Sequence, residues 1–257
     1  ALLAGREQSE EYGIYLRMEG LLQTMRGQYA LSRSTLQRSI DTFQHLSPGG
    51  GNRYAINIAG AYNYIAETWR LQGDYDQAFL AYDQAIIYNR SRGYYPGAAV
   101  FYTNYGVASF QKGETAIARQ LFGYALETYQ AAHEYSGRPI ALSYLAFFEA
   151  REGRYAQAAA YIREAHQVSD QIGSPWWKGI TLYQGWKIRA LLKERGVQAP
   201  EFQGLWPDEA RAHCRQCLDC LHRLQPLPDT PKRLETLEME EALRQLEGGA
   251  ASPSPES

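Results

Sequence analysis

The sequence predicts an all-α fold of about five antiparallel helix pairs packed one after another. The first observation behind this prediction is a turn motif that returns at a fixed distance. It occupies residues 73–78 (GDYDQA) and returns at residues 113–118 (GETAIA) and 153–158 (GRYAQA), 40 residues apart each time. An earlier copy at residues 27–30 (GQYA) lies 46 residues upstream, and the Gly-rich stretch 47–51 accounts for the longer spacing. Self-similarity at such a period is typical of stacked helical repeats.

The second observation is that small residues recur at fixed distances from each turn glycine, in three columns. The columns lie seven residues before it (Gly20, Ala66, Gly106, Ala146), five after it (Ser32, Ala78, Ala118, Ala158) and twelve after it (Ser39, Ala85, Ala125, Ala165). Where two helix axes approach closely, a larger side chain would force them apart. Each repeat is therefore predicted to be a helix, a tight turn and a second, antiparallel helix.

The third observation is the helical period of the apolar residues. Ala78, Tyr82 and Ala85 follow the spacing i, i+4, i+7 of an amphipathic helix, and strand-like alternation is absent. A large residue stands nine positions after each turn glycine, and we expect it to fill the groove formed with the next pair. These residues are Leu36, Tyr82, Phe122 and Ile162.

These columns resemble the tetratricopeptide repeat (TPR) family, which has small residues at corresponding positions. The resemblance covers roughly residues 12–224. The period of 40 is longer than the usual one of the family and is similar to the variety found in bacterial maltose-activator-type regulators and quorum-sensing peptide receptors. The resemblance implies a right-handed α-solenoid, a TPR-like superhelix with a concave ligand-binding face. It also implies an adaptor or sensor rather than an enzyme.

The predicted pairs together form one repeat domain over residues 1–225. They lie near residues 12–46, 54–92, 97–133, 137–172 and 176–225. The fifth pair departs from the pattern, as terminal repeats commonly do because one face meets solvent. Its first helix is expected at 176–194 with Gly185 in the small slot, its turn is enlarged by residues 195–200, and its second helix is expected at 207–224.

The remaining C-terminal part is predicted to hold a linker and an acidic capping helix over residues 226–247. Pro226 and Pro228 end the preceding helix, since proline cannot continue it. The capping helix is expected over 232–247, with an apolar stripe of Leu234, Leu237, Leu243 and Leu246. The Gly, Ala, Ser and Pro content of residues 248–257 predicts a disordered tail.

A binding groove is predicted on the first helix of each pair, on an exposed stripe next to the buried columns. Its residues are Arg17, Asn63, Glu67, Arg70, Thr103, Phe110, Ser143, Phe147, Arg151, Trp186 and Arg189. Arginine and aromatic side chains are enriched where binding energy concentrates, and an Asn amide can grip an extended peptide backbone. We expect the face to bind an extended peptide or a partner helix. The alternative is a solvated face on which Phe110, Phe147 and Trp186 pack against neighbouring helices.

Residues 213–222 carry three cysteines and two histidines, enough ligands for a zinc ion. On one helix, however, Cys214 and Cys217 share the apolar face with Leu218, while Cys220 points about 120° away from Cys217. Cysteine packs as a small hydrophobic residue, so we expect the cysteines to serve the core. Neither a metal nor another cofactor is predicted.

No nucleophile elbow, phosphate loop or dinucleotide fingerprint is present, so the sequence predicts no enzyme and no catalytic residues. The net charge is −2, and basic residues such as Arg90 and Arg92 are offset by acids, which argues against a nucleic-acid partner. No run of 18 apolar residues occurs, which argues against a membrane-spanning helix.

The predicted function is a protein- or peptide-binding module of a cytoplasmic signalling or regulatory protein, including transcription regulation. The cytoplasm is expected because the three cysteines cluster instead of forming a spread disulfide framework. One alternative is a self-associating scaffold, a homodimer in which Trp176, Trp177 and Trp206 form the interface. Another is a ligand-sensing domain of a larger regulator. The chain does not begin with Met, which fits either a processed chain or a piece of a longer polypeptide, and we favour the second; in the ligand-sensing alternative the output domain lies upstream.

Overall fold

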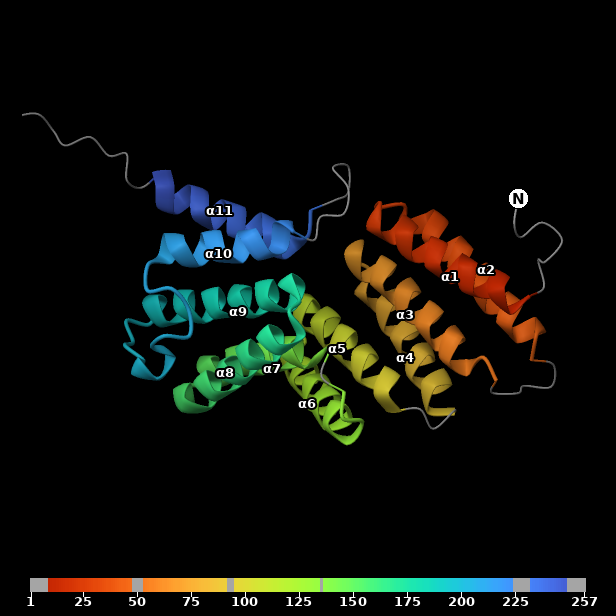
Figure 1. Ribbon diagram of the computed structural model, residues 1–257, viewed down its shortest axis with the longest axis horizontal. Coiled ribbons are helices and arrows are strands. Elements are labelled where there is room, and N and C mark those ends of the chain that lie inside the picture. The colour runs from red at the N-terminus through yellow and green to blue at the C-terminus, as the bar shows by residue number, and fades with distance from the viewer. Residues whose placement is uncertain (1–8, 48–52, 92–94, 135, 224–231, 249–257) are drawn as a thin grey trace, which may run out of the picture. The chain divides into compact units, whose positions relative to one another are not determined.

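The computed structural model describes residues 9–47, 53–91, 95–134, 136–223 and 232–248. Over these ranges the chain is helical and contains no strand (Figure 1). The helices are α1 (Glu10–Met25), α2 (Tyr29–His45), α3 (Ala55–Leu71), α4 (Tyr75–Ser91), α5 (Tyr95–Lys112), α6 (Thr115–Ala131), α7 (Arg138–Arg151), α8 (Tyr155–Ile172), α9 (Pro175–Glu194), α10 (Ala210–His222) and α11 (Leu234–Gly248), with a 3₁₀ helix, η1 (Pro200–Phe202), before α10. The predicted all-α fold of antiparallel helix pairs is confirmed.

The helices belong to two compact units. The first contains α1 to α6, that is, three successive pairs, and the second contains α7 to α11. The single repeat domain over residues 1–225 stays a prediction. Residues 48–51 of the Gly-rich stretch, Pro226, Pro228 and residues 249–257 of the predicted tail lie outside the described residues.

The four turn glycines end the first helix of their pairs in a left-handed conformation. Gly27, Gly73, Gly113 and Gly153 have φ angles of 74°, 80°, 95° and 78°. A residue with a Cβ is strained there, which explains why glycine recurs. After Gly73 the N–H of Asp74 donates to the carbonyl of Trp69 at 3.0 Å, the bond that closes a Schellman motif.

The repeating columns are the contact surface within each pair. All eight small residues of the second helices are 0% exposed, and so are the four large residues between them. A Cβ built on Gly20 would come within 2.5 Å of Leu36 Cγ, and one built on Gly106 within 2.9 Å of Phe122 Cε1. The large residue thus lies directly on the small residue of its own first helix. This contact within the pair adds to the expected one, which placed the large residue in the groove with the next pair.

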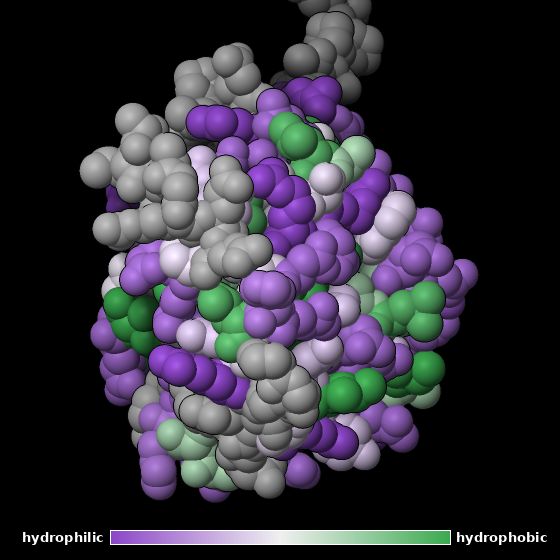
Figure 2. Space-filling model, turned by 90° about the vertical axis from the view of Figure 1, so that its right-hand side faces the viewer, coloured by the Kyte–Doolittle hydropathy of each residue, from purple (hydrophilic) through white to green (hydrophobic). Residues whose placement is uncertain are grey.

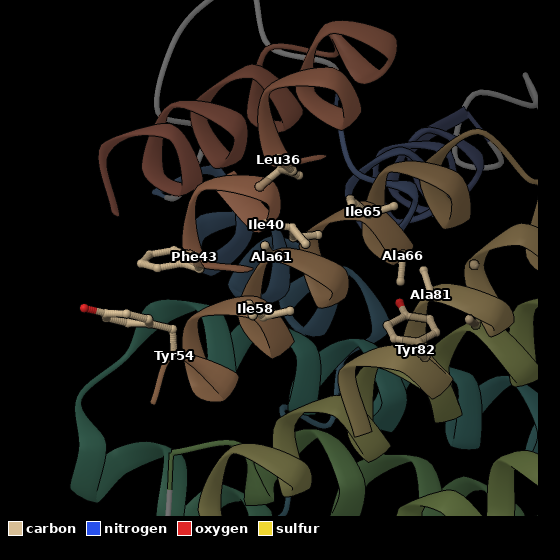
Figure 3. Close-up of a cluster of buried hydrophobic side chains, with 12 residues drawn as sticks. Leu36, Ile40, Phe43, Tyr54, Ile58, Ala61, Ile65, Ala66, Ala81 and Tyr82 are labelled. Carbon is tan, nitrogen blue, oxygen red and sulfur yellow. The ribbon is translucent and has the colours of Figure 1, made fainter. Parts of the chain in front are cut away.

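Successive pairs in the first unit join through a continuous core. Leu36, Ile40 and Phe43 of α2 pack in one cluster with Ile58 and Ala61 of α3 (Figure 3). Tyr82 of α4 extends this packing by stacking on Tyr105 of α5, with ring centroids 5.3 Å apart. The second helix of one pair therefore covers the first helix of the next.

The fifth pair uses an inserted segment in place of a regular contact. Gly185 is buried in the small slot, as predicted, but a Cβ there would come within 2.9 Å of Cε3 of Trp206, which belongs to the insertion. The second helix starts at Ala210 rather than at 207. α11 closes the end of this unit, since its Met239 is fully buried in a cluster with Cys217, Leu218 and Leu221 of α10.

Candidate functional site

A groove of about 620 Å³ opens in the second unit, between α7, α9 and α11. Three predicted binding residues line it: Phe147 and Arg151 from α7, and Trp186 from α9. The other lining residues are Lys187, Ala190, Leu191, Glu194, Leu237, Glu238, Glu241, Ala242 and Gln245. The groove combines aromatic and aliphatic walls with charged groups of both signs.

Helix periodicity explains how these side chains meet. Phe147 and Arg151 are four residues apart on α7, and Trp186, Ala190 and Glu194 are four apart on α9, so each set lies on one helical face. The Arg151 guanidinium lies 5.9 Å from the centroid of the Phe147 ring, within the range of a cation–π contact. Arg151 itself is exposed and therefore reachable by a ligand.

Trp186 is held in place by a buried histidine. The ring of His213 meets it edge-on at 5.8 Å and stacks on Trp206 at 5.6 Å. His213 is 0% exposed, and burial lowers its pKa to about 4. The ring is therefore neutral near pH 7, and its Nε2–H donates to the carbonyl of Leu182 at 2.9 Å. This stack fixes the wall of the groove that Trp186 forms.

The α11 wall is attached to α9 by polar contacts as well as by its apolar stripe. The Tyr183 hydroxyl donates to Glu238 Oε2 at 2.7 Å, and Lys187 Nζ donates to the same hydroxyl at 3.1 Å. Lys187 Nζ also lies 3.7 Å from Glu238 Oε2. Burial, together with the hydrogen bond to Glu238, raises the pKa of Tyr183 far above its usual range. The hydroxyl therefore keeps its proton as a donor.

In the first unit the predicted polar residues of α3 bind partners on α3 itself and on the neighbouring helices α4 and α5. Asn104 of α5 donates its amide to Asn63 Oδ1 of α3 at 3.0 Å. Arg70 pairs with Glu67 at 2.8 Å and donates to Gln111 of α5 at 3.0 Å. Glu67 also accepts from the hydroxyl of Tyr82, which is fully buried. These contacts link α3 to α5 and α4.

Arg17 and Phe110, also predicted for the groove, are half-buried in the first unit. A Cβ built on Gly60 would come within 3.2 Å of Arg17 Nη1, so the arginine of α1 lies across this glycine of α3. Its Nε atom is buried without a hydrogen-bond partner.

Four site predictions are corrected. Asn63, Thr103 and Ser143 are 5%, 2% and 0% exposed, so the prediction that they form an exposed stripe is wrong. Thr103 donates to the carbonyl of Ala99 at 2.8 Å, and Ser143 donates to the carbonyl of Pro139. The reason is that a first helix packs against its own second helix and also against a neighbouring pair of its own unit, so its buried arc is wider than one column.

Arg189 is the fourth corrected residue. It is half-buried and donates to the backbone carbonyl of Asp208 in the segment between η1 and α10. It does not line the groove beside Trp186. The inserted segment between η1 and α10 binds this side chain instead. The sequence pattern did not show the course of that segment.

Several groove residues were missed by the sequence reasoning. Glu194 could have been found, because it continues the four-residue spacing from Trp186 on α9. Leu237, Glu238 and Glu241 could not, because the position of α11 depends on tertiary packing. The stripe of α11 did signal that the helix would be buried on one side.

The cysteines of α10 are part of the core, as the apolar-stripe interpretation predicted. Cys214 and Cys217 are 0% exposed, and the Cys217 thiol donates a hydrogen bond to the carbonyl of Gly179 at 3.4 Å. Burial raises the pKa of Cys214 to about 11 and raises that of Cys217 further. Within the described part of the chain, no group of three or more His, Cys, Asp or Glu side chains is arranged to hold a metal ion.

No protein-family model matches the sequence, and no curated protein matches it. Among solved structures, the crystal structure of the apo form of RapI is similar, with a TM-score of 0.61 and 16% sequence identity. The similarity covers 96% of this chain and 88% of that one. At this identity the likeness concerns the fold alone, and it agrees with an all-helical fold of antiparallel pairs.

Across the described helices, none combines the length and the apolar character that crossing a membrane requires.

Proposed function

We propose that this protein binds a linear peptide, or an extended segment of another protein, in the groove between α7, α9 and α11. The observation that carries the proposal is the convergence of Phe147, Arg151 and Trp186, from the first helices of two successive pairs, on one open groove. Its volume of about 620 Å³ lies within the range of ligand pockets.

The groove fits a peptide that carries an apolar anchor next to an acidic group. Phe147, Trp186, Leu191 and Leu237 offer apolar area for the anchor. Rigid aromatic side chains carry much of the binding energy at such sites, because little conformational entropy is lost when they are covered. The exposed guanidinium of Arg151 supplies a fork of donors for a carboxylate.

The biological setting that we propose is a cytoplasmic signalling or regulatory protein of the long-period TPR variety, as in bacterial transcription regulators and peptide receptors. The 40-residue spacing supports this variety, and the burial of its columns supports the repeat itself. The likeness to RapI supports the fold on which the proposal rests. A ligand-sensing domain of a larger regulator would use the same groove.

Two of the three interface residues of the scaffold alternative contact other side chains of their own unit. Trp206 stacks on Phe202 at 5.2 Å and on His213 at 5.6 Å, so its ring faces are used within the unit. Trp176 is likewise covered by Arg233, whose guanidinium carbon lies 4.0 Å from the ring centroid.

The test is a selection from a displayed library of random linear peptides, followed by fluorescence anisotropy with the enriched peptides. We expect Arg151→Glu and Leu237→Glu to weaken binding at least about ten-fold, a loss of about 1.4 kcal/mol. Both residues are exposed, so we expect their replacement to leave the fold intact.

The matched control is Arg163→Glu, which makes the same charge change at an exposed position of α8 outside the groove. It should bind like the unaltered protein. The proposal fails if no peptide is enriched, or if Arg163→Glu weakens binding as much as Arg151→Glu does.

A further inference from the structure

Helix α1 has an exposed apolar stripe along one side. Tyr15, Met18 and Leu22 are 47%, 45% and 51% exposed, and Ile14 and Met25 flank them at 37% and 36%. The spacing 15, 18, 22, 25 is the alternation of three and four residues that forms a helix–helix seam. On the face of the molecule in Figure 2, hydrophobic residues lie in separate small groups among hydrophilic ones, which is ordinary for a protein surface.

The repeat shows what covers this stripe elsewhere. By the register of the turn glycines, Tyr15 of α1 corresponds to Ala61 of α3 and Leu22 corresponds to Thr68, and both residues of α3 are 0% exposed. Ala61 is covered because Leu36 and Ile40 of α2 pack in the same cluster (Figure 3).

The same register positions are buried on α5, at Phe101 and Ala108, and on α7, at Ala141 and Phe148. The positions that the stripe occupies on α1 are thus buried in the second, third and fourth pairs.

Charge at the two ends of the stripe identifies the occupant. Glu11 continues the stripe four residues before Tyr15, Arg26 directly follows Met25, and both are exposed. The two charges lie about 22 Å apart along the helix axis. A second α1 in antiparallel orientation brings each Glu11 beside the Arg26 of the other copy, whereas parallel packing would bring like charges together.

We propose that this face of α1 binds the α1 of a second copy of the chain, antiparallel and with two-fold symmetry. The pairs Glu11–Arg26 and Tyr15–Leu22 share one centre, beside Met18, so the charged ends and the apolar seam fit in the same register. Such a surface is self-complementary, as an isologous dimer requires. This inference uses only the first unit and goes beyond the peptide-binding proposal.

The contact is small, so the dimer is reversible. One pair of 16-residue helices buries an area at the low end of specific interfaces. Analytical ultracentrifugation of the whole chain, from about 1 µM to about 500 µM, should therefore show a monomer–dimer equilibrium in the micromolar range. A monomer at all concentrations overturns the proposal.

The seam is tested by Leu22→Glu against Leu80→Glu. Leu80 is 61% exposed on α4, so it provides the same substitution at an exposed leucine outside α1. Leu22→Glu should raise the dimer dissociation constant at least ten-fold, while Leu80→Glu should leave it unchanged. Equal effects of the two substitutions contradict the proposal.

The orientation is tested by a charge exchange. Glu11→Arg and Arg26→Glu should each weaken the dimer, because each places two pairs of like charges at the seam. The double variant restores opposite charges and should regain most of the affinity, with unchanged circular dichroism in all three proteins. Failure of the double variant to recover while it remains folded excludes the antiparallel pairing.

Discussion

The two compact units use the same repeat in different ways. In the first unit, α1 to α6 follow the columns closely, and polar residues of neighbouring first helices bind one another, as Asn104 binds Asn63. In the second unit the regular pattern ends at α9, where Trp206 from the insertion takes the contact at Gly185 and α11 adds a further wall. The groove lies where the repeat departs from its pattern.

This difference has a physical cause. A strict repeat makes the same contacts in every pair. Its side chains therefore pack against the next pair and leave little open space between the helices. An additional helix such as α11 has no equivalent in the repeat, so its packing leaves space between its outer face and the first helices. The regular repeats therefore stabilise the fold, and the irregular packing around α11 leaves a groove for a ligand.

The largest expected effect concerns the columns of the first unit. Phe122→Ala should lower the free energy of unfolding by about 3–5 kcal/mol, because it empties the space over Gly106. Tyr124→Ala, at a position 53% exposed on the same helix, should cost far less. Urea denaturation measures both, and equal losses would show that the columns do not form the core.

The next effect belongs to the second unit and depends on pH. His213 has a pKa of about 4 in the folded protein, lowered by burial from the ordinary value of 6.5. Between about pH 4 and pH 6.5 this imidazole binds a proton in the unfolded chain but not in the folded protein. Stability is therefore full above about pH 6.5 and falls as the pH drops toward 4, with a loss of about 2 kcal/mol between pH 7 and pH 5.

The control for this pH effect is His213→Gln, which keeps an N–H donor for the carbonyl of Leu182 but cannot titrate. Denaturation at pH 7 and pH 5 should show that the variant loses less than half as much stability as the unaltered protein. An equal loss in the two proteins would assign the acid sensitivity to other groups, such as His166, whose pKa burial also lowers.

A smaller effect tests the internal pairing of the first unit. Glu67→Ala removes the acceptor of Arg70 and of the buried Tyr82 hydroxyl, so it should cost about 1–3 kcal/mol. Glu127→Ala, at an exposed position of α6, should stay within about 0.5 kcal/mol. If the two substitutions have the same small effect in urea denaturation, Glu67 does not link the helices as described.

Much of the fold could be predicted because one constraint, close helix contact, returns four times. Leu36, Tyr82, Phe122 and Ile162 are all fully buried at the predicted register. The apolar stripe of α11 was predicted only in part. Leu243 and Leu246 pack against the core, whereas Leu234 and Leu237 are 50% and 46% exposed, and the fully buried Met239 was not in the predicted stripe. Repetition turns a weak local preference into a pattern that is visible in a single sequence.

The site could be predicted only in part, because the residues that line it come from the irregular end. Phe147, Arg151 and Trp186 follow from helical spacing, and all three line the groove. Thr103 and Ser143 have the same kind of spacing but are buried, since spacing defines a face and not what covers it. The α11 wall depends on a tertiary contact that does not recur along the chain, so the repeat pattern could not predict it.

Hydrogen–deuterium exchange with and without a selected peptide tests the central claim most directly. The account predicts slower exchange in α7, α9 and α11 on binding, with α1, α3 and α5 unchanged. Slower exchange confined to α1, α3 and α5 would place the ligand on the regular repeats and contradict the claim that the irregular end forms the binding site.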